Sequence, residues 1–238
     1  MRQALQIGRV RRGPVGRPPD AAADARLVAL ARAGDERAFE ALYDRHHRAL
    51  LAYCRHLLGS HDEAEDVVQH AFVAAHRALR DDDRPLELRP WLFAVARNRC
   101  LSLLRARRRH VALEADGPAI DGIAGAVQRR EEVRELLRDL ARLPEDQRSA
   151  LLLAELAALD HATIASVLGC RRERVKALVF QARTALAAMR DARATPCDEI
   201  RGELATARGG RLRRASLRRH LRDCPGCRAF AAEVARQR

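Results

Sequence analysis

Apolar residues recur at spacings of three and four through much of the first half of the chain. Between residues 24 and 110, the repeat includes Leu27, Leu30, Phe39, Leu42, Tyr43, Leu50 and Leu51. This periodicity predicts amphipathic helices, because residues three and four apart share one face of an α-helix. Gly34 and Gly59 predict helix ends. Ser60 followed by Glu63 has the spacing of an N-terminal capping box.

Two stretches without this periodicity divide the chain. Residues 80–90 read RDDDRPLELRP and predict a loop, with Pro85 and Pro90 as helix breakers, before a further helix over 91–110. Residues 111–126 contain no arginine, three glycines and a proline. This change of composition predicts a linker between two helical domains.

A second helical block, residues 127–192, contains two helices joined by a turn. The first is predicted over 161–169 and ends at Gly169, which can take the positive φ of a tight turn. The second, over 171–183, follows at once. Three residues have the small–glycine–apolar spacing of a helix-turn-helix: Ala165, Gly169 and Val175.

The second of these helices opens with Arg171, Arg172, Arg174 and Lys176. In a helix-turn-helix this end enters the major groove, where arginine pairs with guanine edges or phosphates. The alternative is a solvated basic end of a surface helix. Cations at a helix N-terminus oppose the helix dipole, at a cost of roughly a few tenths of a kcal/mol or more. DNA contact is therefore the better interpretation.

Composition supports an all-α fold and a polyanionic partner. The 238 residues are 47% hydrophobic but only 3% aromatic, and alternating strand patterns are hard to find. The net charge of +13 fits either a basic soluble protein or one that neutralises phosphates. No run of about 18 apolar residues and no secretory signal are visible, so we expect a cytoplasmic protein without membrane contact.

No enzymatic site stands out in the sequence. It has no glycine-rich phosphate loop, no nucleophile elbow and no carboxylate pair in a plausible cleft. His46, His47 and His61 are interpreted as surface histidines rather than catalytic ones. An enzyme is therefore not expected.

The C-terminal segment has the spacing of a metal site. His220, Cys224 and Cys227 form H-x3-C-x2-C, and Cys197 upstream completes C-x22-H-x3-C-x2-C. Zn²⁺ takes four N/S donors in a tetrahedron, and we expect Pro225-Gly226 to supply a tight turn between the last two thiolates. The alternative is a set of unrelated thiols and a surface histidine. The remaining cysteines are interpreted as core residues: Cys54, Cys100 and Cys170.

Two neighbouring helices carry opposite charge, and with the helix-turn-helix they resemble a known family. Acidic residues crowd the start of the helix after Ser60, whereas the next helix carries six arginines between Arg97 and Arg109. Over about residues 24–190 the chain resembles an extracytoplasmic-function (ECF) sigma factor of bacterial RNA polymerase. The resemblance is carried in order by AEDVVQHAF, RPWLFAVARNRCLSLLRARRR, LPEDQRSALLL and HATIASVLGCRRERVKALVFQAR.

The resemblance implies roles for particular residues. Docking on core RNA polymerase is implied for Asp62, Glu65, Asp66 and Gln69. Residues 80–90 correspond to the loop that captures a flipped base of the −10 element. Contacts to that element and the adjoining backbone are implied for Trp91, Arg97, Asn98, Arg105, Arg107 and Arg108. Reading of the −35 element is implied for Arg171, Arg172, Arg174, Lys176 and Arg183.

The chain departs from the family pattern at several positions. Ser102 stands where the family often has Asp, three acids occupy 81–83, and Glu173-Arg174 replace the usual Gly-Thr. These changes leave the general role in place, but the promoter sequence does not follow from them.

The C-terminal unit resembles a second family. CDEIRGEL together with RRHLRDCPGCRAF looks like the zinc-binding anti-sigma domain, which clasps a sigma factor. Fused to a sigma factor, it would be a built-in regulator that contacts the sigma domains within the same chain. One Zn²⁺ is expected, in a structural or a redox-sensing role.

The expected protein is thus a promoter-specific sigma factor whose partners are core RNA polymerase and promoter DNA. The alternative is a zinc-containing helix-turn-helix regulator that does not contact polymerase. The predicted domains are a disordered tail (1–22), sigma region 2 (23–110), a linker (111–126), sigma region 4 (127–192) and the zinc-binding unit (193–238).

Overall fold

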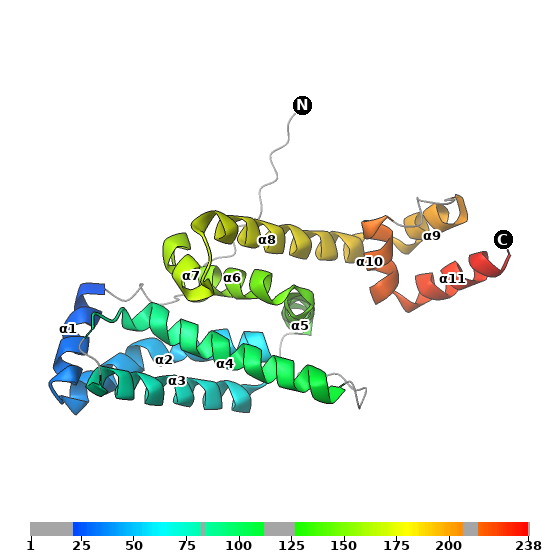
Figure 1. The fold of residues 1–238 in the computed structure, drawn as a ribbon. Helices are drawn as coiled ribbons and strands as arrows, with labels where there is room; N and C mark the ends of the chain where they lie inside the picture. The colour runs from blue at the N-terminus through cyan, green and yellow to red at the C-terminus, as the bar shows by residue number, and fades with distance from the viewer. Residues whose placement is uncertain (1–20, 82–83, 112–126, 207–213, 238) are drawn as a thin grey trace. The chain divides into compact units, whose positions relative to one another are not determined.

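The structure, a computed structural model, describes residues 21–81, 84–111, 127–206 and 214–237 (Figure 1). These residues form helices and no strand, which confirms the predicted all-α class. The elements are α1 (Ala21–Arg32), α2 (Glu36–Leu58), α3 (His61–Asp81), α4 (Leu88–Val111), α5 (Val127–Arg142), α6 (Glu145–Glu155), α7 (His161–Leu168), α8 (Arg172–Ala194), α9 (Cys197–Thr206), α10 (Ala215–Asp223) and α11 (Pro225–Arg236).

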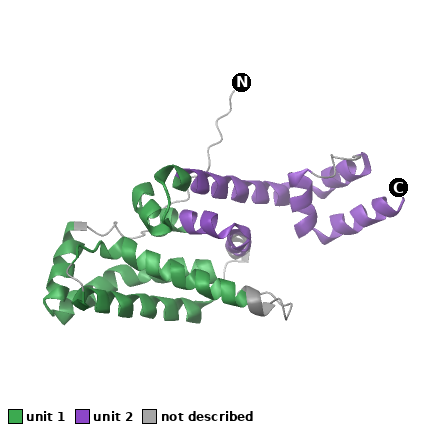
Figure 2. Cartoon of the chain, viewed as in Figure 1, with its two compact units in different colours: residues 1–121, 152–175 green, residues 122–151, 176–238 purple. Residues whose placement is uncertain are grey.

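The chain divides into two compact units (Figure 2). The first comprises residues 1–121 and 152–175, and the second comprises 122–151 and 176–238. The predicted tail over 1–22 and linker over 111–126 lie almost entirely outside the described residues, so they remain predictions. Among the described helices, none combines the length and the apolarity that crossing a bilayer requires.

Helices α1 to α4 pack around the apolar stripes that the periodicity predicted. Leu42, Leu50 and Tyr53 of α2 are fully buried, and the Tyr53 ring meets Phe93 of α4 edge-on at 5.5 Å. An edge-to-face aromatic pair of this kind adds about 0.5–1.5 kcal/mol beyond its buried area. This core holds the outer faces of α3 and α4 rigidly.

The turns between the first helices use the residues that their backbone geometry requires. Gly59 ends α2 in the left-handed region with φ 76°, and its N–H bonds the Arg55 carbonyl. Ser60 Oγ then accepts from the Glu63 N–H at 3.4 Å at the start of α3, as the capping-box spacing predicted. Asp35 caps α2 in the same way, with its side chain accepting from two backbone amides.

The loop predicted over 80–90 is shorter than expected. Helix α3 continues to Asp81, and α4 begins at Leu88. Pro90 therefore lies in the first turn of α4 and does not break it, because a first-turn residue has no intrahelical partner for its N–H. The acids Asp82 and Asp83 lie outside the described residues.

The interpretation of His46 as a surface histidine is wrong, because the side chain lies in a buried cluster of charged groups. His46 is only 2% exposed, and its Nε2 lies 3.0 Å from Asp24 Oδ2, while Arg45 Nη1 donates to Asp24 Oδ1 at 2.8 Å. Burial lowers the pKa of His46 and outweighs the opposing effect of Asp24. His46 is thus a core residue that joins α2 to α1. Its spacing of four from the apolar residues Leu42 and Leu50 could have predicted its burial from the sequence.

The helix-turn-helix forms as predicted. Asp160 caps α7 by accepting from the backbone N–H groups of Ala162 and Thr163, and Gly169 ends it with φ 61°. Val175 is fully buried on α8. Helix α8 continues to Ala194, well beyond the predicted 171–183.

The second unit ends in three short helices around a small core. Ile200, Leu204, Leu217 and Cys227 are buried together, and Leu221 and Phe230 pack against them. The Arg201 guanidinium lies 5.9 Å from the centre of the Phe230 ring, a cation–π contact. The segment thus has only a small apolar core.

Candidate polymerase, DNA and metal sites

One face of α3 carries the residues to which polymerase docking was assigned. Asp62, Glu65, Asp66 and Gln69 are all exposed, and their spacing of three and four places them on a single face. Val67 and Val68 are buried on the opposite side. Packing of that side fixes the orientation of the acidic face.

The residues assigned to the −10 element lie along α4 with different exposure. Trp91 and Arg97 are half-buried, whereas Asn98 and Arg105 are exposed. Leu92, Phe93 and Ala96 bury the other side of the helix. The side chain of Arg108 lies outside the described residues.

Arg107 makes contacts within the protein that the sequence did not indicate. Its Nη1 donates to the Leu58 carbonyl at 2.9 Å, and its Nε donates to Glu63 Oε1 at 3.2 Å, with a further contact from Nη2 to Glu63 Oε2. This two-point pairing ties the end of α4 to the start of α3. The assignment of Arg107 to DNA remains a prediction.

The basic residues assigned to the −35 element run from Arg171, just before α8, to Arg183 at the middle of the helix. Arg171, Arg172, Arg174, Lys176 and Arg183 are all exposed. Phe180 lies one turn beyond Lys176 and is 71% exposed, a large apolar side chain on the basic surface. The sequence analysis did not single out Phe180. The available signal was its position next to Val179, which places Phe180 off the buried face that carries Val175 and Val179.

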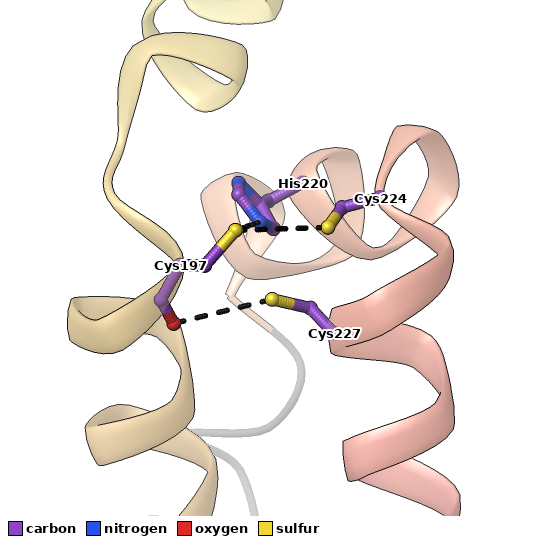
Figure 3. Close-up of side chains that lie close together, drawn as sticks. All are labelled: Cys197, His220, Cys224 and Cys227. Carbon is purple, nitrogen blue, oxygen red and sulfur yellow. Dashed lines mark hydrogen bonds between the residues drawn. The ribbon is translucent and has the colours of Figure 1, made fainter.

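The four predicted metal ligands come together in one cluster (Figure 3). Their ligand atoms all lie within 4.8 Å of one another. Cys197 Sγ lies 3.9 Å from His220 Nε2 and 3.8 Å from Cys224 Sγ. His220 and Cys227 are buried, Cys224 is half-buried and Cys197 is exposed.

These separations fit a tetrahedral ion. A Zn–S bond of about 2.3 Å in a tetrahedron places two sulfurs about 3.8 Å apart, which is the Sγ–Sγ separation of Cys197 and Cys224. A disulfide would need about 2.05 Å, and all four ligands here are soft or borderline donors that suit Zn²⁺. The residues therefore fit the metal that the spacing predicted.

Each ligand is held by a helix end. Cys197 is the first residue of α9, and His220 lies in the last turn of α10. Cys224 ends α10 and precedes α11, with its N–H bonded to the His220 carbonyl at 2.9 Å. The expected turn at Pro225-Gly226 is instead the first turn of α11, where proline is well tolerated.

The thiols of the last two cysteines differ in acidity. A hydrogen bond from the Cys227 backbone, together with contacts from the other three ligand side chains, lowers the pKa of Cys224 to about 6. Burial raises the pKa of Cys227 to about 11. The thiolate form is therefore favoured at Cys224 and disfavoured at Cys227.

A polar cleft of about 580 Å³ opens beside the cluster. Cys197, His220 and Cys224 line it, together with three arginines and three acids from α5, α8 and α10. Asp139 is 2% exposed and accepts from Arg193 Nη1 at 2.9 and 2.7 Å. Arg142 forms a two-pronged pair with Asp223, at 2.8 and 2.6 Å.

Comparison with known families finds two matching segments. A family model described as sigma-70 region 2 matches residues 42–110, and one described as sigma-70 region 4 matches residues 134–186. Together they cover most of α2 to α4 and of α5 to α8, including both surfaces to which DNA contact was assigned. The four metal-ligand candidates lie beyond residue 186, outside both matches.

Curated relatives agree with these matches. The chain is 32% identical to RNA polymerase sigma factor NccH of Alcaligenes xylosoxydans over 71% of this chain and 96% of that protein. It is 33% identical to ECF RNA polymerase sigma factor SigM of Mycobacterium tuberculosis, over 69% and 83%. For the ECF RNA polymerase sigma-E factor of Escherichia coli the identity is 32%, over 67% and 90%.

Solved structures show the same relationship. CnrH, in complex with the cytosolic domain of CnrY, is 32% identical over 71% of this chain and 98% of that chain, with a TM-score of 0.57. The sigma factor RpoE of Bartonella quintana, in complex with the anti-sigma factor NepR, is 28% identical over 62% and 93%, with a TM-score of 0.50.

Proposed function

Because this chain belongs to the extracytoplasmic-function (ECF) sigma factors of RNA polymerase, we propose that it docks on core polymerase through α3 and directs it to promoters through α4 and α8. Sigma factors are transcription initiation factors rather than enzymes, so the chain acts by binding. Its working place is then the cytoplasm, where polymerase and promoters are found.

The acidic face of α3 is the observation that carries this proposal. Four polar or acidic side chains stand exposed on one rigid helix face, at Asp62, Glu65, Asp66 and Gln69. A helix-turn-helix regulator that never meets polymerase needs no such face, and sigma-70 region 2 would be superfluous in it. The alternative function is therefore disfavoured.

DNA recognition is divided between two helices in this proposal. Trp91, Arg97 and Asn98 of α4 face the melted −10 element, and Arg105 follows the backbone. The first half of α8 and the residue before it read the −35 element through the exposed residues Arg171, Arg172, Arg174, Lys176 and Arg183. Both surfaces are solvent-exposed or half-buried on helices whose other side packs in a core.

Co-elution with core RNA polymerase on size exclusion tests the docking surface. We expect the wild-type protein to co-elute at moderate salt and Asp66→Arg to lose most of its binding, because a cation on the acidic face repels the partner's complementary charge. Glu40→Arg changes an exposed acid on the neighbouring helix α2 and serves as the matched control. Equal co-elution of both variants would contradict docking through α3.

For the C-terminal segment we propose a single Zn²⁺ held by Cys197, His220, Cys224 and Cys227. Two observations support this proposal. The four ligand atoms all lie within 4.8 Å of one another, and the Sγ atoms of Cys197 and Cys224 lie 3.8 Å apart, as two sulfurs bound to one tetrahedral Zn²⁺ would. Bound there, Zn²⁺ would join three short helices that share a small core and so supply folding free energy of order 10 kcal/mol.

We further propose that residues 193–238 regulate the sigma regions of their own chain. The related RpoE is solved in complex with an anti-sigma factor, NepR, and in this proposal residues 193–238 play the corresponding part within the same polypeptide. A hydroperoxide could relieve this regulation by oxidising two thiolates. Cys197 and Cys224 would give up two electrons to form one S–S bond, and the O–O bond would be cleaved with uptake of two protons from water, which gives water and an alcohol or a second water.

A further inference from the structure

The end of helix α8 has a backbone group that the helix itself cannot satisfy. In a continuing α-helix the Ala192 carbonyl would accept from the N–H of residue 196. Residue 196 is a proline and has no N–H. Ala192 is 4% exposed, so water is not at hand to replace the donor.

His220 supplies the missing donor. Its Nδ1 lies 2.8 Å from the Ala192 carbonyl oxygen, across 28 residues of sequence, and His220 is itself 4% exposed. The preceding carbonyl, Asp191, is satisfied locally by the Thr195 N–H at 3.1 Å and the Thr195 hydroxyl at 2.9 Å. Ala192 is thus the carbonyl whose partner comes from another helix.

The same bond settles which nitrogen of His220 faces the thiols. With Nδ1 protonated and donating to Ala192, Nε2 presents its lone pair to the cluster, 3.9 Å from Cys197 Sγ. A ligating histidine commonly donates its other nitrogen to an outer acceptor, which fixes the ring. Here that acceptor is the end of the helix assigned to the −35 element.

We infer that metal occupancy of the cluster is coupled to the order of the α8 C-terminus, with His220 as a metal-dependent cap on the Ala192 carbonyl. This inference rests on the proposed metal site. With an ion bound by the three thiolates and by Nε2, the imidazole would be fixed and the cap would be formed. When the metal is removed, the ring is free to turn, and the α8–α9 junction at Thr195-Pro196 loosens.

The coupling gives the regulatory segment a route to the sigma region. Cys197, one proposed ligand, directly follows Pro196 at the α8–α9 junction. His220, a second proposed ligand, donates a hydrogen bond to the Ala192 carbonyl at the same junction. Metal loss therefore loosens the point at which residues 197–238 join α8. Docking of the segment against α5 and α8 becomes dependent on the metal.

Hydrogen–deuterium exchange of the full-length protein, with and without Zn²⁺, tests the coupling. We expect Zn²⁺ to slow exchange over residues 190–197 by about tenfold in the wild type, the size of one buried hydrogen bond. His220→Cys keeps a fourth soft ligand but removes the Nδ1 donor. It should bind Co²⁺, seen by thiolate charge-transfer absorbance, without metal-dependent protection of 190–197.

Pro196→Ala is the complementary variant, because it leaves all four ligands in place and restores the N–H that the helix lacks. Its 190–197 segment should be protected whether or not Zn²⁺ is present. Arg190→Ala, on an exposed part of α8, is the control that should behave as wild type.

The outcomes separate the two ideas. Metal binding by wild type with unchanged exchange over 190–197, or equal protection in wild type and His220→Cys, overturns the coupling and leaves the metal site standing. Absence of any Zn²⁺ or Co²⁺ binding by wild type overturns the metal site and the coupling together.

Discussion

Cys224 is the residue at which backbone structure and thiol chemistry meet. It ends α10 and precedes α11, so the backbone of Cys227, one turn into α11, can hydrogen-bond its thiolate. The same arrangement leaves Cys227 buried among Ile200, Leu204 and Leu217. Two cysteines three residues apart therefore acquire opposite acidities, which neither has by residue type alone.

We expect Cys224 to be alkylated first in the metal-free protein. Because its pKa is lowered to about 6, the reactive thiolate is present above that pH and is lost by protonation as pH falls below it. Cys227, with its pKa raised to about 11, should remain unlabelled at pH 7.5. Iodoacetamide labelling followed by peptide mass spectrometry from pH 5 to 9 measures this order. Preferential labelling of Cys227 at neutral pH would contradict it, and Zn²⁺ should suppress labelling of both.

Among elements, α5 and α10 are joined by a charged contact across 81 residues of sequence. Arg142 and Asp223 pair through two hydrogen bonds, and both side chains are about a quarter exposed, at 31% and 22%. Parallel hydrogen bonds between guanidinium and carboxylate fix orientation as well as distance. The pair therefore holds α10, which carries the ligand candidate His220, against α5.

Arg142→Ala should lower the free energy of unfolding by about 1 kcal/mol, since a partly exposed two-point pair is worth about that much. The hydrogen bond from Arg142 lowers the pKa of Asp223. The contribution is therefore complete above the pKa of an unfolded aspartate and disappears as pH falls through the lowered folded value. Urea unfolding at pH 7 and at low pH measures both effects.

Arg214→Ala is the matched control for this variant. It removes the Arg214–Glu203 pair, which joins an exposed arginine to a half-buried glutamate within the C-terminal segment and does not involve α5. Arg214→Ala should lower the free energy of unfolding by less than Arg142→Ala does. It should also leave hydrogen–deuterium exchange over α10 unchanged. An equal loss of unfolding free energy in the two variants would contradict a particular role for the Arg142–Asp223 pair in holding α10 against α5.

For the whole molecule, charge and metal are expected to act on different partners. The helices assigned to DNA, α4 and α8, are rich in arginine, whereas polymerase docking is assigned to the acidic start of α3. If residues 193–238 compete with polymerase, they would cover the docking face of α3. The charge of the helices assigned to DNA would stay the same.

Removal of Zn²⁺ should therefore increase binding to core polymerase. We expect a several-fold larger co-eluting fraction for chelator-treated wild type and for Cys224→Ser. Cys170→Ser, which changes a half-buried thiol outside the cluster, should bind as untreated wild type does. Binding that is the same with and without Zn²⁺ would leave the metal with a structural role alone.

Much of the local architecture follows from the sequence by itself. Helix positions, the left-handed ends at Gly59 and Gly169 and the buried Val175 all depend on residues within a few positions of one another. Spacing also predicted that Cys197, His220, Cys224 and Cys227 belong together, and the structure brings their ligand atoms within 4.8 Å of one another. Helix ends were less certain, as Pro90 and the length of α8 show, since a first-turn proline and a breaker look alike in sequence.

Tertiary structure decided the contacts between distant residues. Burial of His46 against Asp24, the pairing of Arg107 with Glu63, and the bond from His220 to the Ala192 carbonyl each join side chains or backbone groups from different helices. Hydrophobic periodicity marks which face of a helix is buried but not which helix covers it, because burial is non-directional. A hydrogen bond, by contrast, needs two particular atoms within about 3 Å, and only the packing of the helices brings those atoms together.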